Sequence, residues 1–319
     1  MSFVQGITAI DGIRVGHATD REAVTGCTVV LCERGAVAGV DIRGGATGSE
    51  ELDVLSPSHI TPHIHAIMLS GGSAFGLEAA SGARRWLERR GIGFRTGAAM
   101  VPIVPGAILY DLGIGKAGVR PGREMGEAAC EAATGGEIEE GTAGAGTGAT
   151  CGKFFGLRRA MKAGIGTALA EAGAIKVGAL VAVNPVGDVL DPETGQILAG
   201  ARTAPDSREF ADTVKAMKQG LSRAGVGRTN TTLAVVATNA RLTKVEANRL
   251  AQFAHHGFVR AIRPVHTSMD GDLAFALSYG DATAPLDLLG LLAGEAVAAA
   301  IARAVREATP IAGVPALRP

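Results

Sequence analysis

Glycine is the residue that most constrains how this chain can fold. It occupies 46 of the 319 positions, about twice its usual share of roughly 7%. Because glycine has no side chain, it permits tight turns and lets neighbouring elements approach closely. A hydrophobic content of 47% and a charged content of 19% indicate a globular chain with a large core. We therefore expect one closely packed domain that spans residues 1–319.

Short apolar runs and amphipathic stretches follow one another irregularly along the chain. Strands are predicted at 28–32, 37–42, 67–70, 175–183, 231–237, 259–262 and 273–279, and helices at 77–89, 124–133, 244–256 and 286–308. Neighbouring strands are often joined without a helix, which favours a layered α+β fold over a regular doubly wound sheet. A polar segment with two prolines, 191–230, is predicted to be an exposed linker.

Charge and cysteine usage exclude several classes of protein. The formal net charge is +0, so there is no electrostatic reason to expect a nucleic-acid partner or an anionic membrane surface. The N-terminal stretch lacks the basic start and apolar core of a signal peptide, and the apolar run 288–302 is too short to span a bilayer. The four cysteines match no zinc-site spacing. We expect a cytoplasmic protein without a membrane or nucleic-acid partner.

Two motifs suggest a bound ligand but lack the context that such a site needs. Gly144–Ala149 fits the dinucleotide pattern G-x-G-x-x-A, yet an acidic stretch precedes it where an apolar strand is required. His59, His63 and His65 are closely spaced, but Pro62 interrupts any helix that would align them and no carboxylate lies between them. We interpret these segments as a glycine-rich loop and a surface loop with ordinary histidines.

The stretch Gly71–Gly76 follows an apolar strand and precedes a predicted helix. It is not a G-x-S-x-G nucleophile motif, because Ser73 stands one place early. We predict a backbone turn whose N–H groups bind an anion or a carbonyl oxygen near the start of the helix.

Asn230 and Thr231 lie where the polar segment meets an apolar strand. A threonine hydroxyl is a weak nucleophile unless a base lies nearby. If the bond before Thr231 is cut, its new α-amine, with an unperturbed pKa of about 8, becomes that base. The same hydroxyl can attack the Asn230 carbonyl to give an ester that water hydrolyses. By itself, a threonine that begins a strand is typical of a purely structural residue.

Several motifs, in one order along the chain, resemble a known family. They are DIRGG (41–45), SGGSAFG (70–76), VNPVGD (183–188), TTLAVVATNARLTK (231–244) and HTSMDGD (266–272). The chain resembles the β-peptidyl aminopeptidases, L-aminopeptidase/D-esterases and nylon-oligomer hydrolases from about residue 12 to about residue 306. This resemblance implies an αββα four-layer sandwich, similar to N-terminal-nucleophile hydrolases but with different strand connectivity.

The resemblance also implies a set of site residues. Aminopeptidase members use a serine nucleophile and a later Ser-x-Glu pair, whereas this chain has Thr231 with Asp270-Gly271-Asp272. That combination is similar to the endo-type 6-aminohexanoate-oligomer hydrolase branch. By their motifs, the implied catalytic residues are Thr231, Asp270, Asp272, Lys153 and Asn184, and the implied substrate-binding residue is Tyr110.

These residue types suit the implied chemistry. Asp270 and Asp272 can hold the amine of Thr231 and tune each other's pKa. The Asn184 amide can donate to a tetrahedral oxyanion, which is often worth about 3 kcal/mol. Lys153 can polarise groups around Thr231, and Tyr110 can line the substrate cleft. Without the resemblance, the aspartates would be interpreted as a solvated turn, Asn184 as a turn residue before a proline, Lys153 as a surface lysine and Tyr110 as a half-buried aromatic.

The resemblance therefore implies a self-cleaving amidohydrolase that acts on linear amide oligomers or small peptides through an acyl-enzyme on Thr231. The chain would be cut between Asn230 and Thr231 into 1–230 (α) and 231–319 (β), which stay together and assemble into a homo-oligomer such as a tetramer of heterodimers. No metal and no organic cofactor is implied. The alternatives are an aminopeptidase of the β-peptidyl or D-esterase type, acyl transfer of the ornithine-acetyltransferase type, and an uncut chain without enzymatic activity.

Overall fold

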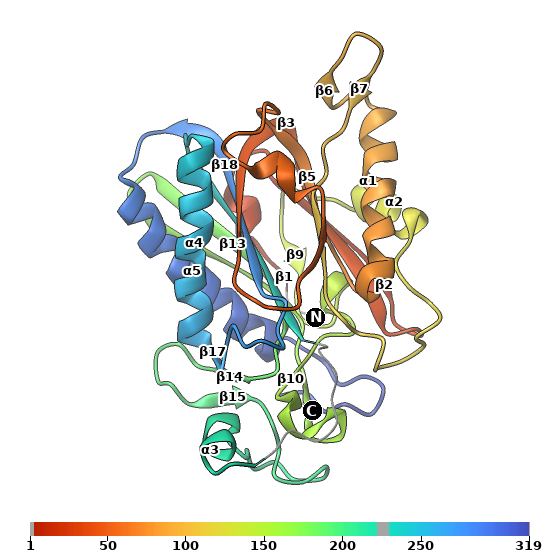
Figure 1. The fold of residues 1–319 in the computed structure, drawn as a ribbon, viewed down its shortest axis with the longest axis vertical. Coiled ribbons are helices and arrows are strands. Elements are labelled where there is room, and N and C mark those ends of the chain that lie inside the picture. Colours follow the sequence, from red (N-terminus) through yellow and green to blue (C-terminus); the bar gives the residue numbers. More distant parts are fainter. Residues whose placement is uncertain (1–2, 222–229, 319) are drawn as a thin grey trace.

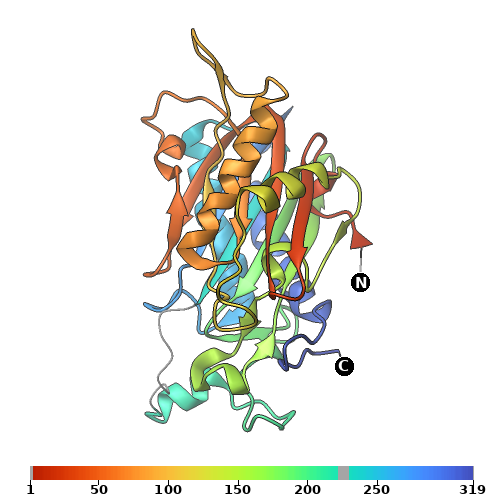
Figure 2. The ribbon, with the colours of Figure 1, turned by 90° about the vertical axis from the view of Figure 1, so that its right-hand side faces the viewer.

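Two β-sheets face each other, and a pair of helices covers the outer side of each sheet (Figure 1). The computed structural model describes residues 3–221 and 230–318. Helices α1 (Glu78–Glu88) and α2 (Arg123–Glu131) pack on one sheet, and α4 (Lys244–Ala261) and α5 (Leu286–Arg306) pack on the other. The view turned by 90° places α1 and α2 in front of the strands (Figure 2). This arrangement confirms the expected αββα sandwich.

The two sheets share one long strand, β3 (Thr25–Ile42). Sheet I has the order β12–β13–β16–β18–β3, with bounds Ile165–Ala172, Ile175–Asn184, Thr231–Ala240 and Leu273–Ala282 for the first four. Sheet II contains β2, β3, β5, β8 and β4, with bounds Arg14–Asp20 (β2), Ile64–Ser70 (β5), Gly106–Ile108 (β8) and Gly48–Glu50 (β4). The first half of β3 pairs with β2 and β5, and its second half pairs with β18. The two predicted runs, 28–32 and 37–42, are therefore one strand.

Smaller elements surround the sheets. A three-stranded sheet has the order β15–β14–β17, and the two-stranded pairs are β1–β9, β6–β7 and β10–β11. Their bounds are Phe3–Val4 (β1), Phe94–Arg95 (β6), Met100–Val101 (β7), Ile138–Glu139 (β9), Thr150–Cys151 (β10), Met161–Lys162 (β11), Asp188–Leu190 (β14), Ile197–Ala199 (β15) and Ile262–Arg263 (β17). Short 3₁₀ helices lie at Ile7–Ala9, Leu52–Leu55, Ser73–Leu77, Gly144–Gly146, Lys153–Phe155 and Leu157–Arg159.

Strand β16 shows why the central strands are apolar on both faces. Its residues Leu233 and Val235 pack between the two sheets. The alternate residues Ala234 and Val236 pack under α4 and α5. Since successive side chains point to opposite faces and both faces are covered, the strand has no polar alternation. The predicted strand 231–237 is thus a continuous apolar run in the middle of sheet I.

The strand predicted at 259–262 is wrong. Helix α4 continues to Ala261, and only Ile262–Arg263 pairs as strand β17. Phe258 and Ala261 are buried with the spacing of one helical face, whereas Val259 is exposed, so most of the run is the last turn of the helix and not a separate strand. At the other end, the side chain and backbone of Thr243 form a reciprocal capping box with Glu246.

The segment 191–221 is more folded than the exposed linker predicted for 191–230. It contains β15, which pairs with β14, and helix α3 (Thr213–Lys218). Thr213 is fully buried, and its backbone N and hydroxyl donate to the buried carboxylate of Asp188. The remainder of the predicted linker, 222–229, lies outside the described residues.

Helix α5 is long and apolar enough, by length and composition, to cross a membrane. Its most apolar stretch is, however, 72% buried inside the protein. It packs on β12, β13 and α4. The helix is therefore a buried core helix, as the sequence indicated.

Glycine sets the distance between helices and their neighbours. A Cβ atom at Gly166 of β12 would lie 2.2 Å from the carbonyl oxygen of Ala300 in α5. A Cβ at Gly126 of α2 would lie 1.9 Å from the carbonyl oxygen of Ala79 in α1. Backbone atoms cannot move aside as a flexible side chain can, so these contacts exist only because both positions lack a side chain.

We predict that Gly166→Ala destabilises the fold by about 1–3 kcal/mol, because the added methyl group forces α5 away from sheet I. Urea unfolding followed by the fluorescence of the single tryptophan, the buried Trp86, measures the change. Gly118→Ala is the matched control, since a Cβ there meets nothing within 4 Å. Equal stabilities for the two variants would contradict the assigned role of Gly166.

Candidate active site

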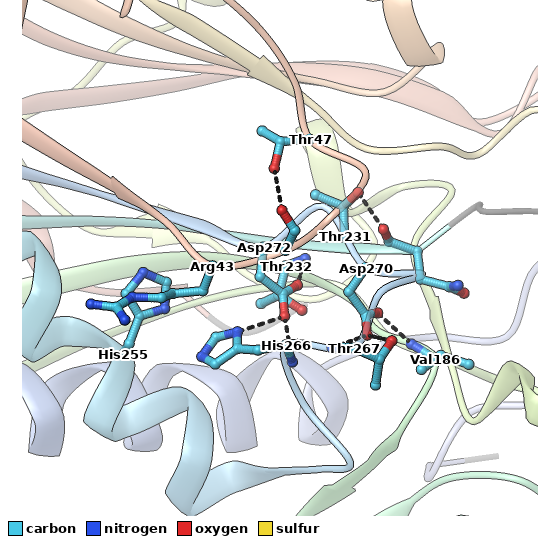
Figure 3. Close-up of polar contacts among 12 residues, drawn as sticks. Arg43, Thr47, Val186, Thr231, Thr232, His255, His266, Thr267, Asp270 and Asp272 are labelled. Carbon is cyan, nitrogen blue, oxygen red and sulfur yellow. Dashed lines mark hydrogen bonds and ion pairs between the residues drawn. The ribbon is translucent and has the colours of Figure 1, made fainter.

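Three neighbouring strands bring most of the predicted site residues together. In the antiparallel pair β13–β16, Asn184 lies directly opposite Thr231. In the parallel pair β16–β18, Leu233 lies opposite Leu273, and Asn230 forms a bridge with Asp270 just before the two strands begin. The start of β16 is therefore held between Asn184 on one side and the aspartates on the other. Figure 3 shows Asp270 and Asp272 close to Thr231 and Thr232.

The bond between Asn230 and Thr231 lies in the interior, where both residues are almost completely buried. The Thr231 hydroxyl donates to the carbonyl oxygen of Asn230 at 2.6 Å. The backbone N of Gly271 donates to the same oxygen at 2.8 Å. A Cβ at Gly271 would lie 2.7 Å from Thr231 Oγ1. The glycine thus lets its N–H reach the carbonyl without displacing the hydroxyl.

Asp272 holds the start of β16 from the neighbouring strand. Its carboxylate is fully buried, and Oδ1 accepts a hydrogen bond from the backbone N of Thr232 at 2.7 Å. Oδ2 accepts from His266, through the backbone N at 3.1 Å and through Nδ1 at 3.0 Å. Sequence reasoning did not select His266, although it opens the same motif, HTSMDGD, that contains both aspartates.

Asp270 is the second buried carboxylate. Its Oδ1 accepts from the backbone N of Val186 at 3.1 Å, and its Oδ2 accepts from the backbone N and the hydroxyl of Thr267. Burial, followed by the charge of Asp272, raises the pKa of Asp270 to about 6. The hydrogen bonds from Thr267 and Val186 and the charge of Lys153 lower the pKa by a smaller amount. The two aspartates form no solvated turn, because both are fully buried.

Lys153 and Asn184 form a buried pair on the β13 side of Thr231. Lys153 Nζ donates to the backbone oxygen of Asn184 at 2.9 Å and to its Oδ1 at 2.6 Å. The backbone N of Thr150 also donates to Oδ1. Asn184 Nδ2 donates to the backbone oxygen of Tyr110 at 3.2 Å, and the Tyr110 side chain is half-buried. In the uncut chain, the amide donor of Asn184 is therefore engaged by the Tyr110 carbonyl.

The glycine-rich turn at 71–76 binds an anion that belongs to the chain itself. The backbone N of Gly72 donates to Oδ1 of Asp111 at 2.7 Å. Asp111 is buried, and the hydroxyl of Thr25 donates to its other oxygen. Burial raises the pKa of the Asp111 carboxyl, while these hydrogen bonds lower it. The predicted anion-binding turn thus positions α1 through an internal carboxylate.

The other two motifs that could suggest a bound ligand form ordinary local structure. Gly144–Gly146 forms a buried 3₁₀ helix packed on β3. His59 lies in a loop, where its Nδ1 accepts from the backbone N of Thr61. The surface loop predicted for all three histidines is wrong for His65, which is buried in β5, where its Nδ1 accepts from the backbone N of Ile103. Within residues 3–221 and 230–318, no three His, Cys, Asp or Glu side chains are grouped so that they could hold a metal ion.

Comparison with solved structures identifies the class of fold. The chain superposes with a TM-score of 0.72, at 20% identity, on the L-aminopeptidase D-Ala-esterase/amidase of Ochrobactrum anthropi, covering 95% of this chain and 86% of that one. That protein is described as a new variant of the N-terminal-nucleophile (Ntn) hydrolase fold. The fold of this chain is the same variant, in agreement with the connectivity implied by the sequence resemblance.

The chain belongs to peptidase family S58, whose profile matches residues 5–317. It is 40% identical to an uncharacterised aminopeptidase of Mycobacterium tuberculosis, over 99% of this chain and 97% of the relative. It is 37% identical to a 6-aminohexanoate-oligomer endohydrolase of Kocuria sp., over 86% of this chain and 75% of the relative. The protein is thus a hydrolase of peptide-like amide bonds.

The raised pKa of Asp270 predicts how stability depends on pH. The folded chain binds this proton more tightly than the unfolded chain, whose value is near 3.8, so the stability contributed by this group falls as pH rises from about 4 to about 6. The free energy of unfolding that this group contributes falls by at most about 3 kcal/mol over this range. We predict that Asp270→Asn removes this loss.

Urea unfolding at several pH values between 4 and 7.5 tests this prediction, with Thr231→Ala present in both proteins so that each stays a single polypeptide. The difference in unfolding free energy between the Asp270→Asn variant and its Asp270 parent should grow with pH in the window from about 4 to about 6. A difference that shrinks or stays constant across the window would show that the folded chain does not prefer the protonated carboxyl.

Proposed function

We propose that this chain cuts its own Asn230–Thr231 bond and then uses Thr231 as the N-terminal nucleophile of an amidohydrolase. One observation carries the proposal. The Thr231 hydroxyl and the Gly271 N–H both donate to the carbonyl oxygen of Asn230, at 2.6 and 2.8 Å. A nucleophile and an electrophilic activator therefore meet at the bond that is to be cut.

The self-cleavage step follows from this geometry. Thr231 Oγ1 attacks the carbonyl carbon of Asn230, and the hydroxyl proton is transferred to the Thr231 nitrogen as the C–N bond breaks. The Gly271 N–H stabilises the negative charge that develops on the carbonyl oxygen. Water then hydrolyses the resulting ester. The products are a chain 1–230 that ends in the Asn230 carboxylate and a chain 231–319 with a free amine on Thr231.

The freed amine makes Thr231 a nucleophile for other amides. With an unperturbed pKa of about 8, the amine can take the hydroxyl proton as Oγ1 attacks the substrate carbonyl. The amine half of the substrate leaves with that proton, and water releases the acid half from the acyl-enzyme. We assign catalytic roles to Asn184, Lys153, Asp270 and Asp272, and a substrate-binding role to Tyr110. Asn184 at the end of β13, with Lys153 hydrogen-bonded to it, lies on one side of Thr231. The two aspartates, just before β18, lie on the other side.

We propose linear amide oligomers or small peptides as substrates, cut within the chain as the name of the Kocuria relative states for its own substrate. The pairing of Thr231 with Asp270-Gly271-Asp272 favours this activity. The second candidate is removal of N-terminal residues, which the aminopeptidase name of the M. tuberculosis relative favours. Neither activity needs a metal ion or an organic cofactor in the steps above.

The two pieces are expected to stay together, because strand β16 of the small piece pairs with β13 of the large piece from Thr231 to Thr238. We further propose a cytoplasmic homo-oligomer, such as a tetramer of these heterodimers. Val245 and Val259 of α4 are 64% and 61% exposed, and subunit contacts in such an assembly could cover them.

The proposed self-cleavage can be tested by the masses of its products. We expect the wild-type protein to yield two fragments, the smaller beginning at Thr231, whereas Thr231→Ala remains a single inactive chain because it lacks the attacking oxygen. Intact-mass measurement and denaturing gels distinguish the two. Thr232→Ala is the matched control and should still be cut, since the Thr232 hydroxyl has no hydrogen-bond partner among the described residues. A wild-type protein that stays at full length would contradict the proposal.

The proposed substrate class can be tested with the processed enzyme. The processed enzyme should cut 6-aminohexanoate oligomers at internal amide bonds with a higher kcat/KM than it shows on aminoacyl nitroanilides. Mass spectrometry of the products tells internal cleavage from stepwise removal of terminal units. Faster turnover of the nitroanilides would favour the aminopeptidase, and faster transfer to an added amine than to water would favour acyl transfer.

A further inference from the structure

His266 is attached to the site by two hydrogen bonds to one carboxylate oxygen. Its backbone N and its ring Nδ1 both approach Asp272 Oδ2, at 3.1 and 3.0 Å. An ionised carboxylate only accepts hydrogen bonds, so Nδ1 must carry the proton in this contact. The other ring nitrogen, Nε2, is buried and has no hydrogen-bond partner among the described residues. Among the described residues, Asp272 is thus the hydrogen-bond partner that orients the ring.

Helix α4 holds the His266 ring in place from the other side. The ring of His255 packs edge-on against it with centroids 4.7 Å apart, and that of Phe258 lies at 5.5 Å. His255 Nε2 lies 3.2 Å from the backbone oxygen of Asp41 and 3.3 Å from its Oδ2. Burial lowers the pKa of His255 to about 4, so His255 is neutral and does not repel its neighbour near pH 7. In Figure 3, His266 lies between His255 and the Asp272 carboxylate.

The backbone is strained where it aims this side chain. His266 has φ of +53°, in the left-handed region that few residues other than glycine adopt. Such conformations persist only where surrounding contacts over-determine them. Here those contacts are the two hydrogen bonds to Asp272 and the ring packing on α4.

We propose that His266 is a positioning residue for the amide hydrolysis and self-cleavage proposed above, on which this inference rests. Its Nδ1–H fixes the rotation of the Asp272 carboxylate. The carboxylate then keeps Oδ1 on the backbone N of Thr232, which sets the position of Thr231 at the start of β16. His266 touches neither Thr231 nor the scissile bond in any described contact, so it acts through Asp272.

This arrangement separates an effect on activity from an effect on stability. The side-chain carboxylate of Asp272 accepts three hydrogen bonds, from Thr232 N, His266 N and His266 Nδ1. Losing only the third leaves the carboxylate buried and still bound by two backbone donors. The fold should therefore persist while the carboxylate gains freedom to rotate, and a small misplacement of reacting groups lowers the rate strongly.

Two substitutions that tolerate the left-handed backbone test the role. Asparagine replaces the Nδ1–H with a side-chain N–H at nearly the same place, whereas glycine adopts the same backbone and offers no donor. We expect His266→Gly to lower kcat and the self-cleavage rate by about tenfold or more, with KM within about twofold of wild type. His266→Asn should recover both rates to within about threefold. His256→Ala, at the exposed residue beside His255, is the control and should leave both rates unchanged.

The measurements are a time course of precursor loss, steady-state kinetics of the processed enzyme and the melting temperature of each variant. If His266→Gly keeps wild-type rates, or if His266→Asn is as slow as His266→Gly, the positioning role is overturned. If the glycine variant does not fold, His266→Gln is measured in its place. The glutamine side-chain N–H lies near the position of His266 Nε2 and not of Nδ1, so the positioning role requires lower rates for His266→Gln than for His266→Asn. A wild-type protein that neither cuts itself nor hydrolyses amides overturns the proposed function instead.

Discussion

The register of three adjacent strands is the constraint on which the whole site depends. Strand β16 is antiparallel to β13 and parallel to β18, so its first residue meets Asn184 on one side and the loop before Leu273 on the other. A shift of one residue in either pair would turn Thr231 to the opposite face of the sheet. The apolar cores on both sides of sheet I resist such a shift, because alternate side chains of each strand pack among different neighbours on the two faces. Packing energy thereby fixes the geometry of the proposed site.

The site combines ionisable groups with almost complete burial. Asp270, Asp272 and Lys153 are all nearly inaccessible to solvent, and a buried charge without partners would be costly. Backbone N–H groups of Val186, Thr267, Thr232 and His266 satisfy the two carboxylates, and Lys153 lies on the oxygens of Asn184. The polar site is therefore supported by main-chain atoms whose positions the fold already determines.

The sequence predicted the layered fold, the long helices and the segments that meet at Thr231, because apolar periodicity and the order of motifs can be read directly from the sequence. It predicted β3 as two strands, since Arg34 and Gly35 interrupt the apolar run while hydrogen bonding continues past them. Strand β12 was missed because only Ile165 and Leu169 of its eight residues carry large apolar side chains. The contacts of His266 depend on a left-handed backbone and on packing against α4. The reach of the Gly271 N–H depends on the close approach of this glycine to Thr231. No spacing in the sequence reveals either.

The central place of β16 has a consequence for a chain cut before Thr231. The piece that begins there has 89 residues, since 319 minus 230 is 89, and it carries β16, β18, α4 and α5. It supplies the middle of sheet I and that sheet's entire helical cover, so neither piece retains a complete core after separation. An uncut chain can regain its fold alone, whereas two separated pieces must first find each other. Cleavage would turn refolding from a first-order into a second-order process, with a recovery that depends on protein concentration.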